Sequence, residues 1–170
     1  MSQDFKIMKN IFILLFFISF FGNAQDLKEI RAQYPKAVES TEITAKFDGE
    51  FSNVDSSSKP TLLAYKGAVL TLKAKFAKKK SDKIDFFKEG VSLIESAVKA
   101  EPSDIEIRYI RMSVQENSPR FLGYHKNIEE DKEFILKNYP NVSSKELKMV
   151  IKDFVMNSEN FNESENSAFK

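Results

Sequence analysis

Apolar residues recur every three or four positions along most of the chain, and the alternation typical of β-strands is nearly absent. The pattern is broadest from Pro60 onward, where it predicts a helix with a wide apolar face and therefore two packed neighbours. Proline suits the first turn of this helix because its missing N–H has no helical partner there. The recurring apolar positions are Leu62, Tyr65, Val69, Leu72 and Phe76.

Start and stop signals divide the next part of the chain into two helices. The first is predicted from an N-cap at Ser81 to a stop at Pro102. The second is predicted from Ser103 to about Asn117, because Ser103 and Glu106 have the spacing of a capping box. Together these signals predict a helix, a tight corner and another helix.

The remaining apolar pattern predicts helices on both sides of this central region. After a bend at 119–124, one helix should end at Pro140, and a capping box of Ser143 and Glu146 should open the next. Near the N-terminus, "DLKEIRAQY" reads as a short helix stopped by Pro35. The following "KAVESTEITAKFDGEF" fits a second helix, although its threonines leave a strand at "TEITAKF" open.

The first residues have the features of a secretory signal peptide. Lys6 and Lys9 precede the apolar run "IFILLFFISFF", and small residues in "GNA" place the cleavage between Ala24 and Gln25. The run is too short for a membrane anchor, and translation starts at Met1 or at Met8. We therefore expect an exported protein, periplasmic or secreted, with no membrane insertion after signal cleavage.

These patterns predict a signal peptide over residues 1–24, a helical domain over 25–156 and a polar tail over 157–170 that we expect to be disordered. Removing 24 of the 170 residues leaves 146, the size of one domain. The mature chain keeps 24 basic and 24 acidic residues, so its net charge gives no argument for nucleic acid or for an anionic membrane. The chain has no cysteine, so packing alone must hold the fold.

An ending is repeated along the chain as "IRAQYP", "AVKAEP" and "ILKNYP". The last two prolines, Pro102 and Pro140, are 38 residues apart, and a serine-capped helix is predicted after each. The segment "FKEGVSLIESAVKAEPSDIEIRYI" resembles the second helix of a tetratricopeptide repeat followed by the first helix of the next repeat. "LLAYKGAVL" resembles a first helix, with Gly67 at the family's small, closely packed position.

The resemblance covers about 60–140 as two units, each longer than the 34-residue repeat of the family. It implies an all-α fold, a short tetratricopeptide-like array of antiparallel helix pairs with capping helices at both ends. It also implies a binding scaffold with a concave groove. The segments "RYIR" and "FLGY" resemble those of small exported bacterial proteins with no assigned activity, and this second resemblance implies no function.

Arg108, Arg111 and Gln115 are spaced three and four residues apart and form one polar stripe on a largely apolar helix. Both arginines stand where the tetratricopeptide repeat has large apolar residues. In one interpretation the stripe is an exposed face with ordinary surface arginines. In the other it faces inward and meets Asp131, which lies on the expected buried side of its own helix. Such a pair could be structural, or an unpaired guanidinium could bind a carboxylate or phosphate of a ligand.

Tyr124 and His125, the only histidine, lie in the bend "SPRFLGYHKN", where we expect a packing or surface role for the histidine. A single histidine without an identifiable nucleophile or orienting carboxylate does not define a catalytic site. One histidine, no cysteine and no EF-hand spacing also argue against a metal site, and no cofactor motif is present.

We therefore predict an exported, non-enzymatic binding or scaffold protein with a protein or peptide partner and no nucleic acid. Two alternatives stay open. One is an enzyme with a cleft around Arg108, Tyr124, His125 and Asp131, and the other is a purely structural helical protein. The candidate binding residues are Arg108, Arg111, Gln115, Tyr124 and Asp131.

Overall fold

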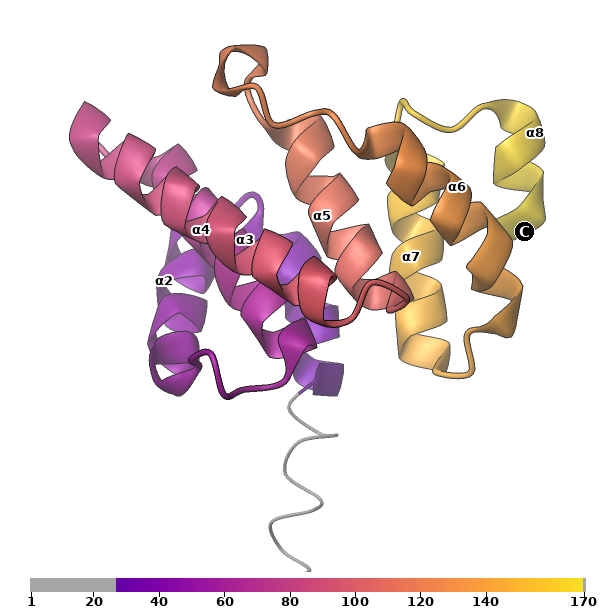
Figure 1. Cartoon of the computed structure of the whole chain (residues 1–170), viewed down its shortest axis with the longest axis horizontal. Helices are drawn as coiled ribbons and strands as arrows, with labels where there is room; N and C mark the ends of the chain where they lie inside the picture. Colours follow the sequence, from indigo (N-terminus) through magenta and orange to yellow (C-terminus); the bar gives the residue numbers. More distant parts are fainter. Residues whose placement is uncertain (1–26, 170) are drawn as a thin grey trace, which may run out of the picture.

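The computed structural model describes residues 27–169, and over this range the protein is all-α with no strand (Figure 1). A helix through residues 27–37 comes first. The longer helices that follow are α2 (Thr41–Glu50), α3 (Pro60–Phe76), α4 (Lys80–Ala100), α5 (Ile105–Asn117), α6 (Ile128–Asn138) and α7 (Lys145–Asn157). Short turns are η1 (Phe51–Asn53), η2 (Arg120–Leu122), η3 (Tyr139–Asn141), α8 (Glu163–Asn166) and η4 (Ser167–Phe169). The signal peptide predicted over residues 1–24 lies outside the described residues, and none of the helices within 27–169 has the length and apolarity to cross a membrane.

The predicted helices are present, but the N-caps of α5 and α7 lie one residue later than predicted, and the predicted N-cap Ser81 lies inside α4. Asp104, not Ser103, caps α5, because its carboxylate accepts hydrogen bonds from the backbone N–H groups of Glu106 and Ile107 at 2.7 and 3.3 Å. Ser144, not the serine before it, caps α7 by accepting from the N–H of Leu147 at 3.2 Å. The N-cap residue of α4 makes no side-chain capping hydrogen bond.

The N-terminal part is helical throughout its described length. The first helix continues two residues past Pro35, where a proline in the last turn removes only one backbone hydrogen bond. The segment left open between helix and strand forms α2, which Ser40 caps by accepting from the N–H of Ile43. Thr44 donates a hydrogen bond from its hydroxyl to the carbonyl oxygen of Ala37, at the end of the first helix. One of the threonines that favoured a strand is thus accommodated in α2 by a side-chain hydrogen bond.

α3 occupies the centre of the described fold, with α2, α4 and α5 packed around it (Figure 1). This position agrees with the wide apolar face predicted from its sequence. α3 and α4 approach each other closely where Gly67 and Gly90 face each other. A Cβ atom built on either glycine would lie 2.5 Å from the carbonyl oxygen of the other, so only glycine fits at both positions.

Residues 158–169, expected to be disordered, are folded in the structure. Phe161 and Phe169 are buried, and their rings contact each other at a centroid distance of 6.1 Å. Phe169 also packs on Tyr139 at 4.3 Å, and Phe161 on Phe154 at 6.4 Å. Only two aromatic residues anchor this segment, and they are too widely spaced to produce a helical period in the sequence. The polar, aperiodic composition therefore suggested disorder.

Burial raises the pKa of all five tyrosines of the chain above the ordinary value. For Tyr34 the pKa rises from 10.0 to about 12. The folded state therefore holds these protons more tightly than the unfolded state. For Tyr34 the associated stability is complete below pH 10 and is lost as the pH rises through about 12. We expect a spectroscopic titration to show the tyrosinate step of the folded protein displaced above pH 10, and the step at the ordinary pKa in guanidinium chloride. A native step at the ordinary pKa would contradict this packing.

Candidate functional site

The polar stripe of α5 is buried against α6 and pairs there with a carboxylate. Arg111 donates from Nε to Oδ2 of Asp131 and from Nη2 to Oδ1, both at 2.7 Å. Asp131 is 0% exposed, because it occupies the inward side of α6 as its spacing predicted. This two-point geometry is the strongest form of an arginine–carboxylate pair and fixes the two helices relative to each other.

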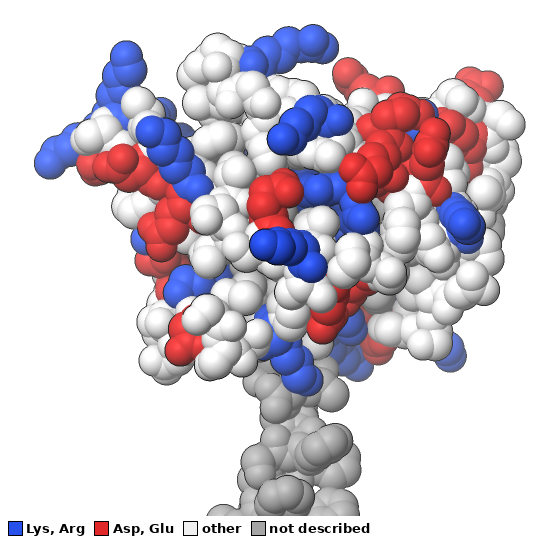
Figure 2. Space-filling model, in the orientation of Figure 1, with Lys and Arg blue, Asp and Glu red and all other residues white. Residues whose placement is uncertain are grey.

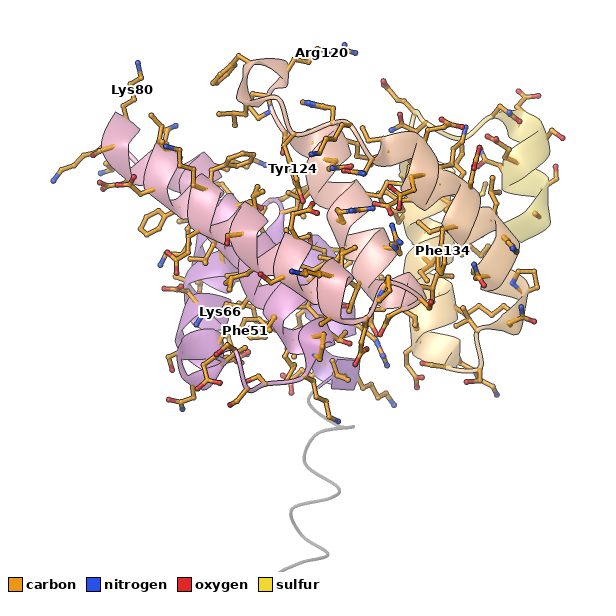
Figure 3. All side chains as sticks on the ribbon, in the orientation of Figure 1. Phe51, Lys66, Lys80, Arg120, Tyr124 and Phe134 are labelled. Carbon is orange, nitrogen blue, oxygen red and sulfur yellow. The ribbon has the colours of Figure 1, made fainter. Side chains whose placement is uncertain are left out.

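Arg108 lies one turn earlier on α5 and binds the same carboxylate. Its Nη1 donates to Oδ1 of Asp131 at 3.0 Å and also to Glu130, and its Nε donates to the carbonyl oxygen of Pro102 at 2.9 Å. The guanidinium lies 5.2 Å from the ring centroid of Phe134, which is labelled in Figure 3. Arg108 therefore joins the α4–α5 corner to α6.

Glu95 of α4 extends the network to the bend after α5. One of its oxygens accepts a hydrogen bond from the Tyr124 hydroxyl at 2.7 Å, and the other lies 3.4 Å from Nη1 of Arg111. Tyr124 lies between α4 and α5 in Figure 3. A continuous polar chain thus runs from Tyr124 through Glu95 and Arg111 to Asp131, connecting the bend with three helices.

Burial and charge act in opposite directions in this network. Burial raises the pKa of the Asp131 carboxyl, and hydrogen bonds from Arg111 and Arg108 partly offset that rise. Burial lowers the pKa of Arg111, but the hydrogen bond and charge of Asp131 outweigh it, so the Arg111 pKa is raised. Burial and the hydrogen bond to Glu95 raise the pKa of Tyr124, which stays protonated and donates.

The interpretation of the stripe as an exposed face is therefore wrong, and the predicted pairing with Asp131 is confirmed. Two guanidinium groups meet three carboxylates, those of Asp131, Glu130 and Glu95. The cluster has no surplus positive charge with which to hold an anionic ligand. Its geometry fits a structural connection between helices better than a ligand site.

The other predicted site residues lie at the edge of this network or outside it. Gln115 is fully buried and reaches only Asn127, with its Nε2 3.5 Å from Oδ1 of that residue. Its Oε1 has no hydrogen-bond partner among residues 27–169. His125 has Nε2 2.8 Å from the carbonyl oxygen of Ser118, and since a carbonyl only accepts, that nitrogen carries the proton and donates. This hydrogen bond connects the bend to the C-terminal end of α5.

A second buried polar cluster was missed from the sequence. Arg31 donates to both oxygens of Glu106 at 2.7 and 2.6 Å, and the Tyr65 hydroxyl donates to Glu106 at 2.8 Å. The sequence had assigned Glu106 to a capping box, but its side chain instead connects the first helix, α3 and α5. Glu95 was missed as well, because nothing in the pattern of α4 distinguishes it from a solvent-exposed acid.

An open groove of about 410 Å³ lies along α4, beside the buried network. Its apolar lining comes from both α4 and the bend, and consists of Ile84, Phe87, Val91, Leu122 and Tyr124. Phe121, which precedes the lining residue Leu122 in the sequence, is 87% exposed. Gly123 turns the bend with φ 68°, in the left-handed region that glycine adopts without strain, and Tyr124 packs inward while Phe121 remains outside.

The described residues contain no group of three or more histidine, cysteine, aspartate or glutamate side chains placed to hold a metal ion. No protein-family model matches the chain, and searches of curated proteins and of solved structures found no significant match. The groove and the residues around it are therefore the features of the described chain that bear on function.

Proposed function

We propose that the protein is an exported, non-enzymatic binding or scaffold protein, built on a tetratricopeptide-like stack of helix pairs. We place its binding surface at the groove along α4. The observation that carries this proposal is an open apolar groove together with a largely exposed aromatic residue, Phe121, which directly precedes the lining residue Leu122 in the bend. Burying a side chain of this size contributes about 1.5–3 kcal/mol, so a partner that covers it gains binding energy.

The packing of consecutive helices supports the stacked-pair architecture. α3 packs mainly on α4, and α5 packs on α6 more than on any other single helix, as expected when each pair forms a structural unit. Residues 77–79 form a short connection between α3 and α4. Gly67 and Gly90 lie at similar distances from this connection along their helices, as in an antiparallel pair. The N-terminal helices and α7 would then act as the capping elements that two repeat units need.

The polar network supports a binding role by making the groove rigid. Glu95 and Tyr124 belong to both the groove and the network, and their hydrogen bond holds the bend against α4. A groove whose walls are already fixed loses little conformational entropy when a partner binds. This favours the binding surface over the enzyme alternative, since Arg108, Arg111 and Asp131 satisfy one another in the interior.

Selection of random peptides on the immobilised mature chain tests the proposal. Peptides that recognise the groove should bind the double variant Ile84→Ser, Phe121→Ser about tenfold more weakly or worse, because both apolar contacts are lost. Ile84 is 36% and Phe121 87% exposed, so the fold should tolerate both changes.

The matched control is Met149→Ser with Met156→Ser on α7, where the side chains are 60% and 43% exposed but lie outside the groove. This control should bind like wild type. Failure to enrich any peptide, or peptides that bind the groove variant as tightly as wild type, would overturn the proposal.

A further inference from the structure

The charged residues around the groove are nearly all basic. Lys88 and Lys126 line it, Lys80 lies at the start of α4, and Arg120 lies in the bend (Figure 3). None of these four side chains forms a salt bridge within the described part of the chain. Figure 2 shows white surface between α4 and the bend, with blue side chains along its border and a red group on the side toward α5.

The acidic residues of α4 do not offset this charge at the groove. Glu95 is the only carboxylate among the lining residues, and both of its oxygens already face Tyr124 and Arg111. Asp85 and Glu89 stand about 100° and 140° around the helix from Ile84, on another side of α4. The free charges at the rim are therefore positive, while the protein as a whole is nearly neutral.

We infer that the groove binds an amphipathic segment of a partner protein, with apolar residues on one face and aspartate or glutamate on its flanks. This inference rests on the proposed function and names the partner chemistry of the same groove. The apolar wall contributed by α4 extends from Ile84 through Phe87 to Val91, a rise of about 10 Å over seven residues. That length accommodates two turns of a partner helix with apolar side chains at i, i+3 or i+4, and i+7.

The basic residues at the rim favour acidic residues on the flanks of the segment, and the apolar wall of α4 binds the apolar residues of the segment. Exposed ion pairs at a rim each change affinity by about fivefold at most and weaken as salt is added. Several pairs acting together give a preference of about tenfold or more for an acidic over a basic segment, mainly through faster association. Lys88 and Lys126 are the closest of these charges to the apolar lining, so they should account for most of the preference.

Two labelled peptides with identical leucine anchors test the inference, one with glutamate and one with lysine at the flanking positions. Fluorescence anisotropy should show wild type binding the acidic peptide at least about tenfold more tightly at low salt, with the difference shrinking as salt is raised. Lys88→Glu with Lys126→Glu should abolish or reverse the preference. Lys137→Glu with Lys145→Glu makes the same change in net charge at exposed positions outside the groove, and should leave the preference intact.

Equal binding of both peptides, or an unchanged preference in the Lys88, Lys126 variant, overturns the inference. If neither peptide binds but selected peptides still require Ile84 and Phe121, the acidic preference fails and the proposed function stands. If selection fails too, both the inference and the proposed function fail.

Binding to phosphatidylglycerol vesicles without peptide binding would assign the groove to lipid. A dimer in sedimentation that the Ile84, Phe121 variant abolishes would assign it to a second copy, and either result overturns the inference.

Discussion

Replacing Asp131 with alanine is expected to lower the free energy of unfolding by about 3–5 kcal/mol. The change leaves Arg108 and Arg111, both almost fully buried, without the carboxylate that binds them at 2.7–3.0 Å. The two guanidinium groups then face only the more exposed carboxylates of Glu130 and Glu95. Desolvation of incompletely paired buried charge is the costly part, since the pair itself contributes little net stability. Urea unfolding measures the loss directly, and the melting temperature should fall by about 10 °C.

Glu130→Ala is the matched control, because Glu130 accepts from the same Arg108 but its side chain is largely exposed. We expect it to cost less than about 1 kcal/mol. Replacing Arg108, Arg111 and Asp131 together with leucine or methionine should restore most of the stability lost in Asp131→Ala, because the buried charges disappear together. A free energy of unfolding for Asp131→Ala within about 1 kcal/mol of wild type would show that water reaches the arginines.

The arginine network shows how far spacing alone can predict a buried site. Three- and four-residue spacing placed Arg108 and Arg111 on one side of α5, and Asp131 on the inward side of α6, so their pairing followed once the two helices were packed together. Glu95 could not be predicted, because its partner Tyr124 lies in an irregular bend whose path depends on the left-handed Gly123. A helical period gives the direction of a side chain only within a helix.

The other differences between the sequence predictions and the structure lie at helix ends and in the C-terminal segment, which few contacts hold in place. Adjacent residues compete for a cap: Ser103 and Asp104 both precede α5, and the structure uses the aspartate. The folded segment 158–169 depends on Phe161 and Phe169 reaching Phe154 and Tyr139, contacts between elements that have no local pattern. The all-α class could be predicted because it depends on period, and these details could not because they depend on tertiary packing.

Gly67→Ala and Gly90→Ala are each expected to destabilise the protein by about 2–3 kcal/mol, even though alanine is the better helix former by about 1 kcal/mol. A Cβ at Gly67 would lie 2.5 Å from the carbonyl oxygen of Gly90 and 2.8 Å from Cγ1 of Ile94. The obstacle is backbone, which cannot rotate away as a side chain does, so α3 and α4 must separate. Gly49→Ala is the matched control, because nothing lies within 4 Å of its Cβ position in α2.

Gly49→Ala should raise stability by up to about 1 kcal/mol through helix propensity alone. The two tight glycines should be non-additive, since one displacement of α4 relieves both contacts, and the double variant should cost less than the sum of the single ones. The same displacement moves Glu95 away from Tyr124, so a Gly67→Ala protein that is still folded should also bind groove-directed peptides more weakly. If Gly67→Ala changes neither the stability nor the peptide binding, α3 and α4 must be farther apart at this contact than the 2.5 Å from the built Cβ to the Gly90 carbonyl oxygen implies.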